Sequence, residues 1–207
     1  MFVARILYPV EVLGHGKRIG IWLCGCKHKC KGCSNPELWN AQEKYNISIK
    51  NILELIDKIA KTNDVDGFTI TGGEPFEQYA ELSLLISELS NISNDILIYT
   101  GYTLNELKAK KKKQIDFILS AIAVLIDGKY VEELNDNSLL CGSSNQTIHV
   151  LNEKYNDRYT QYLLTAANQI QNFNIINGVI SVGIHKPNFI NELNENLENK
   201  GLKEEAK

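Results

Sequence analysis

The chain has 207 residues, of which 43% are hydrophobic and 23% charged, and its formal net charge is −3. This balance is typical of one medium-sized domain that buries its own core, and it gives no indication of nucleic-acid binding, which relies on basic surfaces. No stretch approaches the ~18 apolar residues of a membrane span, and Arg5, Pro9 and Glu11 interrupt the N-terminus, so neither a membrane anchor nor a signal peptide is expected.

Strand and helix patterns alternate along the chain, which predicts an α/β fold with a parallel sheet and flanking helices. The expected strands are 19–23, 67–71, 96–99, 121–126, 148–150 and 179–184. The expected helices are 49–59, 82–89, 104–119 and 158–170. We expect one domain over residues 1–190, followed by a polar tail, 191–207, that is frayed or disordered.

Four short segments directly follow expected strands. They are the cysteine-rich loop after residue 23, Gly72-Gly73-Glu74, Thr100-Gly101 and Asp127-Gly128-Lys129. In parallel α/β folds, ligands gather where loops meet at the carboxyl ends of the strands. We therefore expect all four segments on one face of the sheet.

Four of the five cysteines lie between positions 24 and 33, which indicates a metal site in a reducing cytoplasm and not a disulfide framework. The spacing of Cys26, Cys30 and Cys33 suits one side of an iron–sulfur cube and leaves one iron open. A structural zinc site completed by Cys24 or His28 is the alternative, although zinc modules usually supply a second ligand pair farther along the chain. Otherwise Cys24 is a small residue at a strand end, and Cys141 is a core or loop thiol.

The motif Cys26-x3-Cys30-x2-Cys33 resembles the cluster motif of the radical S-adenosylmethionine (SAM) superfamily. The longer stretch from Gly25 to Trp39, with its Asn-Pro-Glu-x-Trp ending, resembles the activating enzymes of anaerobic (class III) ribonucleotide reductases. Further matching segments extend the resemblance over roughly residues 12–150; they are 71–75, 99–102, 124–129 and 142–146.

This resemblance implies a partial, open α/β barrel of about six parallel strands with flanking helices. It implies a 4Fe–4S cluster on Cys26, Cys30 and Cys33, with SAM bound at the open iron. Reductive cleavage of SAM would give a 5′-deoxyadenosyl radical, which removes a hydrogen from a glycine of the large subunit of anaerobic ribonucleotide reductase. The resemblance also implies a flavodoxin- or ferredoxin-type electron donor.

Eight residues outside the cysteine loop are candidates for contacts with SAM. Gly72 and Gly73 let the backbone approach a ligand closely, or else form an ordinary turn. Glu74 would accept the ammonium of SAM, as the family motif implies, or would open a helix with Pro75. The other candidates are Thr100 and Ser143 for ribose or carboxylate, Asp127 and Lys129 as an Asp-x-Lys motif with a monovalent cation near Asp127, and His185 after the last expected strand.

Two other functions compete with the activase. A radical SAM enzyme could instead modify a small metabolite or peptide directly, but such enzymes usually carry an extra cysteine-rich or peptide-recognition domain, and only one cysteine follows position 33. The third hypothesis is a non-enzymatic zinc or electron-transfer module. No general acid–base pair is expected, because the cofactor performs the bond cleavage and the protein positions it.

Overall fold

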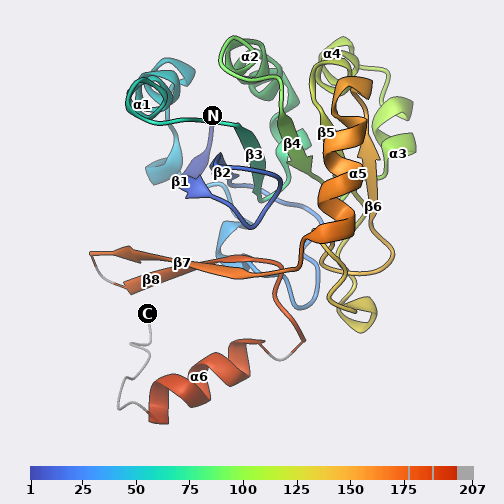
Figure 1. The fold of residues 1–207 in the computed structure, drawn as a ribbon. Coiled ribbons are helices and arrows are strands. Elements are labelled where there is room, and N and C mark those ends of the chain that lie inside the picture. Colours follow the sequence, from blue (N-terminus) through green and yellow to red (C-terminus); the bar gives the residue numbers. More distant parts are fainter. Residues whose placement is uncertain (177, 188, 200–207) are drawn as a thin grey trace.

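We describe the fold from a computed structural model, which describes residues 1–176, 178–187 and 189–199. A six-stranded sheet in the order β1 to β6 forms its centre (Figure 1). Strands β2, β3, β4 and β5 run parallel, and β1 and β6 pair antiparallel at the two edges. The bounds are β1 Val3–Val10, β2 Arg18–Leu23, β3 Gly67–Gly72, β4 Ile96–Tyr99, β5 Val124–Asp127 and β6 Thr147–Val150.

The expectation of about six parallel strands is therefore wrong for the two edge strands. A parallel neighbour needs a long crossover connection, usually a helix, whereas an antiparallel neighbour needs only a turn or loop. β1 reaches β2 through residues 11–17, and β5 reaches β6 through a segment without an α-helix. β1 itself was not expected from the sequence.

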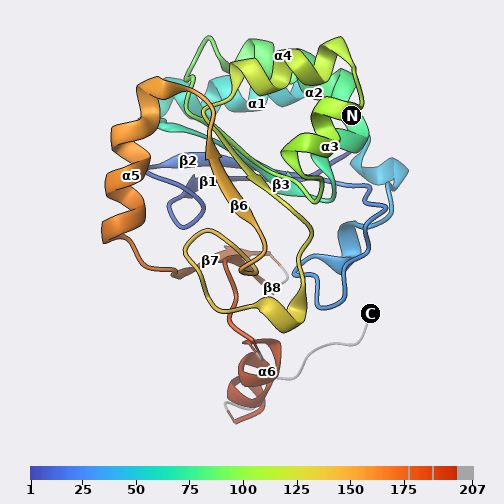
Figure 2. The same ribbon diagram turned by 90° about the vertical axis from the view of Figure 1, so that its right-hand side faces the viewer.

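Helices α1 (Ile49–Thr62), α2 (Tyr79–Leu89) and α4 (Lys113–Ala121) lie side by side over one face of the sheet (Figures 1 and 2). Their apolar sides form one buried cluster with alternate residues of the strands, such as Ile19, Ile21 and Leu23 of β2. This alternation follows from the strand geometry, which points successive side chains to opposite faces. The sheet thus has a helix-covered face and a second face.

The helix expected over 104–119 is two helices, α3 (Leu104–Ala109) and α4. Lys111 between them has a φ of 50°, a left-handed conformation that no helix interior accommodates. The expected helices at 49–59 and 82–89 are confirmed as α1 and α2. The expected helix at 158–170 is α5 (Asn156–Thr165), which ends before residue 170.

A separate antiparallel hairpin of β7 (Ile170–Ile175) and β8 (Gly178–Gly183) lies on the second face of the sheet (Figure 1). The strand expected at 179–184 is β8, which pairs with β7 and not with the main sheet. Val182 of β8 is buried with Trp22 and Leu38, so the hairpin covers the face of β2 opposite the helices. This explains why every residue of β2 is buried.

Helix α6 (Phe189–Asn199) follows the hairpin and crosses the expected boundary at residue 191. The rest of the expected tail, residues 200–207, lies outside the described residues. Within the described part of the chain, every helix is too short or too polar to span a lipid bilayer.

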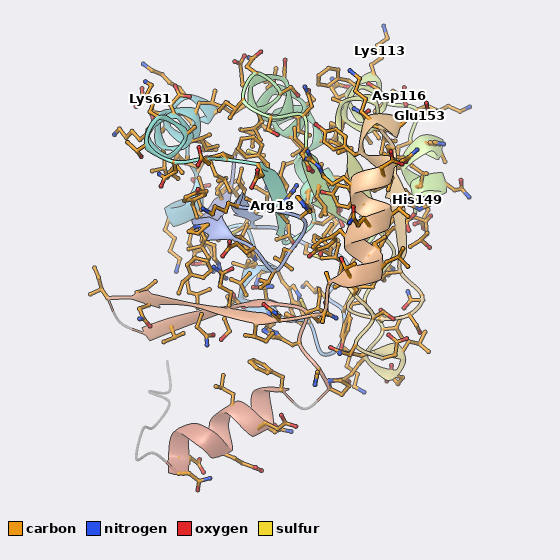
Figure 3. The ribbon with its side chains drawn as sticks, viewed as in Figure 1. Arg18, Lys61, Lys113, Asp116, His149 and Glu153 are labelled. Atoms are coloured by element: carbon orange, nitrogen blue, oxygen red, sulfur yellow. The ribbon has the colours of Figure 1, made fainter. Side chains whose placement is uncertain are left out.

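The amino-terminal ends of the strands are joined by Arg18, which is fully buried. Figure 3 shows its side chain inside the molecule, whereas Lys61 and Lys113 project from helices α1 and α4. Arg18 donates hydrogen bonds to the hydroxyl of Thr69 at 2.7 Å and to the carboxylate of Asp95 at 3.1 Å. The carboxyl-terminal ends of the same strands lie at the opposite edge of the sheet and carry the loops described next.

Candidate functional site

The loops that follow β2, β3, β4 and β5 surround one cavity of about 660 Å³. Cys26, Glu74, Thr100 and Gly128, one from each of these four loops, all line it. The expectation that the four segments converge on one face is therefore confirmed. The parallel register of the four strands is the reason, because it places their carboxyl ends at the same edge.

The cysteine loop presents three thiols to this cavity. Cys26, Cys30 and Cys33 line it and are partly exposed, whereas Cys24 and Cys141 are buried elsewhere. Among the residues that the structure describes, no three Cys, His, Asp or Glu side chains converge on one point as the ligands of a single ion would. The ligands of a cube each bind a different iron atom.

Backbone hydrogen bonds hold the two ends of the cysteine loop together. The amide of Gly25 donates to the carbonyl of Leu38 at 2.9 Å, and that of Cys26 donates to the carbonyl of Trp39 at 2.8 Å. Gly25 has a φ of +95°, which favours glycine at this turn. The loop therefore leaves β2, circles past the three thiols and returns beside its own start.

Burial raises the pKa of the Cys26 and Cys30 thiols, because a thiolate loses hydration there. For Cys30, the neighbouring Cys33 and Cys26 raise it further. The thiolate forms of Cys26 and Cys30 are thus unfavourable without a cation, whereas a bound metal deprotonates its thiol ligands outright. This chemistry fits a site that is filled by a metal cluster.

Gly72 and Gly73 line the cavity, and their closest neighbours belong to the cysteine loop and to the end of β2. A Cβ at Gly73 would stand 2.5 Å from the carbonyl oxygen of Gly25, and Gly72 has a φ of +105°. The amide of Gly73 donates to the carbonyl of Leu23 at 2.7 Å. These glycines therefore let the loop after β3 pack directly against the backbone before the first cluster cysteine.

Glu74 is 1% exposed and joins the loops around the cavity. Its carboxylate accepts hydrogen bonds from the amide of Phe76 at 3.0 Å, the hydroxyl of Thr100 at 2.8 Å and the amide of Gly101 at 2.7 Å. The imidazole Nε2 of His28 lies 3.3 Å from it. A carboxylate has about four acceptor positions, so most of its capacity is used inside the protein.

His28 is a residue whose position the sequence did not reveal. The sequence offered it only as an alternative zinc ligand, whereas its side chain is 9% exposed and packs edge-on against Tyr102, with ring centroids 4.6 Å apart. A Cβ at Gly101 would stand 2.6 Å from its ring. His28 therefore fixes the cysteine loop against the loop after β4.

Asp127, Lys129 and Ser143 do not line the cavity, although Gly128 does. The Asp127 carboxylate accepts from the amide of Leu104 at 2.6 Å and lies 3.0 Å from Nε2 of His149. The Ser143 hydroxyl accepts from the amide of Val131 at 3.1 Å, and Lys129 is exposed. Contacts of these three residues with a ligand remain predictions.

Besides Nε2 of His28, which lies 3.3 Å from the Glu74 carboxylate, three polar atoms around the cavity are buried without a hydrogen-bond partner among the described residues: Nε1 of Trp39, the hydroxyl of Tyr99 and Nε2 of His185. Neither Trp39 nor Tyr99 was among the residues expected to contact a ligand. Burial raises the pKa of Tyr99 and lowers the pKa of His185, and in both cases it favours the uncharged form. Because buried polar atoms are normally paired, these three fit a site completed by a polar ligand.

An α/β sheet whose strand-end loops carry three thiols at one cavity fits an iron–sulfur protein, and residues 12–149 match the family of the 4Fe-4S single cluster domain. The anaerobic ribonucleoside-triphosphate reductase-activating protein of Enterobacteria phage T4 is 34% identical over 147 residues, which are 69% of this chain and 90% of the relative. The proteins of the same description from Salmonella typhimurium and Escherichia coli K12 are 35% and 33% identical over 155 and 153 residues, in each case 70% of this chain and 96% of the relative. The chain belongs to the family of the anaerobic ribonucleoside-triphosphate reductase-activating proteins.

Proposed function

We propose that the chain is a radical SAM enzyme that generates a glycyl radical on an anaerobic ribonucleoside-triphosphate reductase. The observation that carries the proposal is the placement of three thiols, from Cys26, Cys30 and Cys33, in the wall of one cavity at the carboxyl ends of four parallel strands. The family of 4Fe-4S single cluster domains and the named relatives support it.

In this proposal the three cysteines hold a 4Fe–4S cluster and leave one iron free for SAM. When bound, the reduced cluster and SAM supply the radical chemistry that removes a hydrogen atom from a glycine Cα of the reductase. The protein contributes position and exclusion of water. The cavity of about 660 Å³ falls within the size range of small-molecule and cofactor sites.

We assign the predicted SAM contacts according to their place at this cavity. Gly72, Gly73, Thr100 and His185 line it and are proposed to contact SAM directly. Glu74 lines the cavity too, and its hydrogen bonds with Thr100 and Gly101 position the loops. In this proposal its remaining acceptor position binds the ammonium of SAM.

Asp127, Lys129 and Ser143 support the loop after β5 in this proposal. Asp127 binds the first amide of helix α3, at Leu104, and Ser143 binds the amide of Val131. A monovalent cation at Asp127 would share the carboxylate with Leu104 and His149. Lys129 is exposed and free to reach the mouth of the site.

We propose a flavodoxin- or ferredoxin-type electron donor in a reducing cytoplasm. Lys27, Lys29 and Lys31 are exposed on the cysteine loop, which carries no acidic residue between Cys26 and Cys33. Lys27 pairs with Glu77 at 2.6 Å and Lys31 pairs with Glu132 at 3.0 Å, so most of this positive charge is balanced within the chain, and the donor is proposed from the family resemblance and not from the charge of this loop.

The test combines the reconstituted protein, SAM, a reductant and the candidate reductase without oxygen. A glycyl doublet in the electron paramagnetic resonance spectrum, together with 5′-deoxyadenosine, supports the proposal. Cys26→Ala, Cys30→Ala and Cys33→Ala should abolish both signals, whereas Cys141→Ala, a buried thiol outside the cavity, should keep them. A protein with a full cluster that produces neither signal would contradict the proposal.

A further inference from the structure

The C-terminal segment, defined as residues 170–199 with β7, β8 and α6, forms one wall of the cavity. It lies after the stretch that matches the family, residues 12–149. The matches to the three relatives named above cover 69% or 70% of this chain. Nevertheless Ile184, His185 and Phe189 line the same cavity as the three cysteines.

This segment is fastened to the body of the protein at several points. Val182 is 3% exposed and packs in a cluster with Trp22 and Leu38. The side-chain amides of Gln171 and Asn135 donate to the carbonyls of Pro9 at 2.7 Å and of His185 at 3.0 Å, respectively. The segment therefore holds His185 at a fixed place in the cavity wall.

The rings of His185 and Phe189 are stacked, with centroids 4.2 Å apart and an interplanar angle of 1°. Nε2 of His185 is buried and has no hydrogen-bond partner among residues 1–176, 178–187 and 189–199. Burial lowers the pKa of His185, so the neutral imidazole has one donor and one acceptor. The hydroxyl of Tyr99 and Nε1 of Trp39 add two more unpaired polar atoms to the same cavity.

We propose that His185 and Phe189 form a purine-binding wall, which recognises the adenine of an adenosyl ligand. A flat aromatic pair with unpaired polar atoms suits a heterocycle that has two π faces and a polar edge, and stacking on aromatic side chains contributes strongly to base binding. The methionine part of SAM has no flat group to place there. This inference rests on the proposed function and adds that a segment beyond the family match supplies the nucleoside site.

The test measures the binding of 5′-methylthioadenosine and of SAM to the anaerobically reconstituted protein by isothermal titration calorimetry. His185→Ala and Phe189→Leu should each weaken both affinities about tenfold, because one stacked base is worth about 1–3 kcal/mol. His185→Phe, which keeps a flat ring, should lose less than His185→Ala. Phe117→Leu on α4, an exposed phenylalanine outside the cavity, should change neither affinity.

Iron and sulfide content, measured in each protein, should stay at the wild-type value in all variants. If both His185→Ala and Phe189→Leu bind 5′-methylthioadenosine and SAM as tightly as the wild-type protein, the inference is overturned. This conclusion holds even if the variants activate the reductase less well. The proposed function is tested separately by the wild-type protein. If the wild-type protein cleaves SAM and both variants keep their affinity, the purine-binding wall alone is refuted. If the wild-type protein does not bind SAM, the proposed function is refuted.

Discussion

The carboxylate of Glu74 connects three loops that follow different strands. It lies in the loop after β3, accepts from Thr100 and Gly101 in the loop after β4, and stands beside His28 in the cysteine loop. A buried carboxylate is costly unless donors surround it, and here three donors do. The relative positions of the loops therefore depend on one side chain.

Glu74→Gln should destabilise the protein by about 1–3 kcal/mol, because the new amide nitrogen is a donor that faces a donor from either Thr100 or Gly101. The free energy of unfolding in urea is the measurement. Glu77→Gln is the matched control, because the Glu77 side chain is more exposed, at 17%. This substitution should lower the free energy of unfolding by less than about 1 kcal/mol. Equal losses for the two variants would show that Glu74 does not hold the loops.

The five cysteines should separate into two groups when the native protein reacts with iodoacetamide at pH 8. Burial raises the pKa of Cys141 to about 11, so its thiol stays protonated and unreactive until the pH approaches that value, and Cys24 is 1% exposed. Burial also raises the pKa of Cys26 and Cys30, but these two thiols and Cys33 are partly exposed, so they should be labelled faster than Cys24 and Cys141 in cluster-free protein and protected after reconstitution. Peptide mass spectrometry measures the labelling, and protection of Cys24 or Cys141 in place of one of the three would contradict the assigned ligands.

At the scale of elements, the two ends of the parallel strands have different tasks. At the amino-terminal ends, Asp95 before β4 accepts from Arg18 of β2 and from Tyr159 of α5, the latter at 2.6 Å. Arg158 of α5 adds an ion pair at 2.9 Å. These bonds tie β2, β4 and α5 together at the edge of the sheet opposite the cavity. Stability is concentrated at one edge and the candidate site at the other.

Asp95→Ala should reduce the free energy of unfolding by about 3–5 kcal/mol, because it leaves the buried guanidinium of Arg18 without its partner. Denaturation in urea measures the loss. Glu54→Ala, which removes the exposed i,i+4 pair with Lys50 at 3.9 Å, should cost only about 0.5 kcal/mol. The folded fraction of Asp95→Ala should still take up a full cluster, and a stability loss no larger than that of Glu54→Ala would refute the structural role.

At the scale of the whole molecule, the cavity is closed by segments from distant parts of the chain. Strand-end loops form most of its wall, and the C-terminal segment forms the rest. The hairpin of β7 and β8 covers the sheet face opposite α1, α2 and α4, as Figures 1 and 2 show. The site therefore lies between a rigid sheet edge and an added layer.

Hydrogen exchange should report this division between the sheet and the cysteine loop. Amides of β2 to β5 belong to the sheet ladder and should be protected with or without the cluster. The loop over residues 25–39 is held by few backbone bonds, so its amides should gain protection when the cluster binds. Exchange followed by mass spectrometry is the measurement. A loop that exchanges at the same rate in both forms would contradict a cluster anchored by this loop.

The sequence by itself determined the features that depend on local spacing. The cysteine triplet, the four central strands and the glycine turns after them all follow from neighbouring residues, and the parallel sheet then required these turns to meet. Two edge elements were not found locally. In β1 only the end residues are buried and Pro9 interrupts the pattern. In β7 the first residue, Ile170, was assigned to a helix, and residues 171–175 were assigned to no element.

Only the tertiary structure decided which side chains face the cavity. Trp39 and Tyr99 come from two different segments, and no local pattern distinguishes an aromatic residue in a core from one in a cavity wall. The hydrogen bonds that turn Glu74 into a connector also span 26 or more residues of sequence. The periodicity of a helix or strand indicates on which face of that element a residue lies. The residue that it contacts across that face depends on how distant elements pack, and only the complete fold determines that packing.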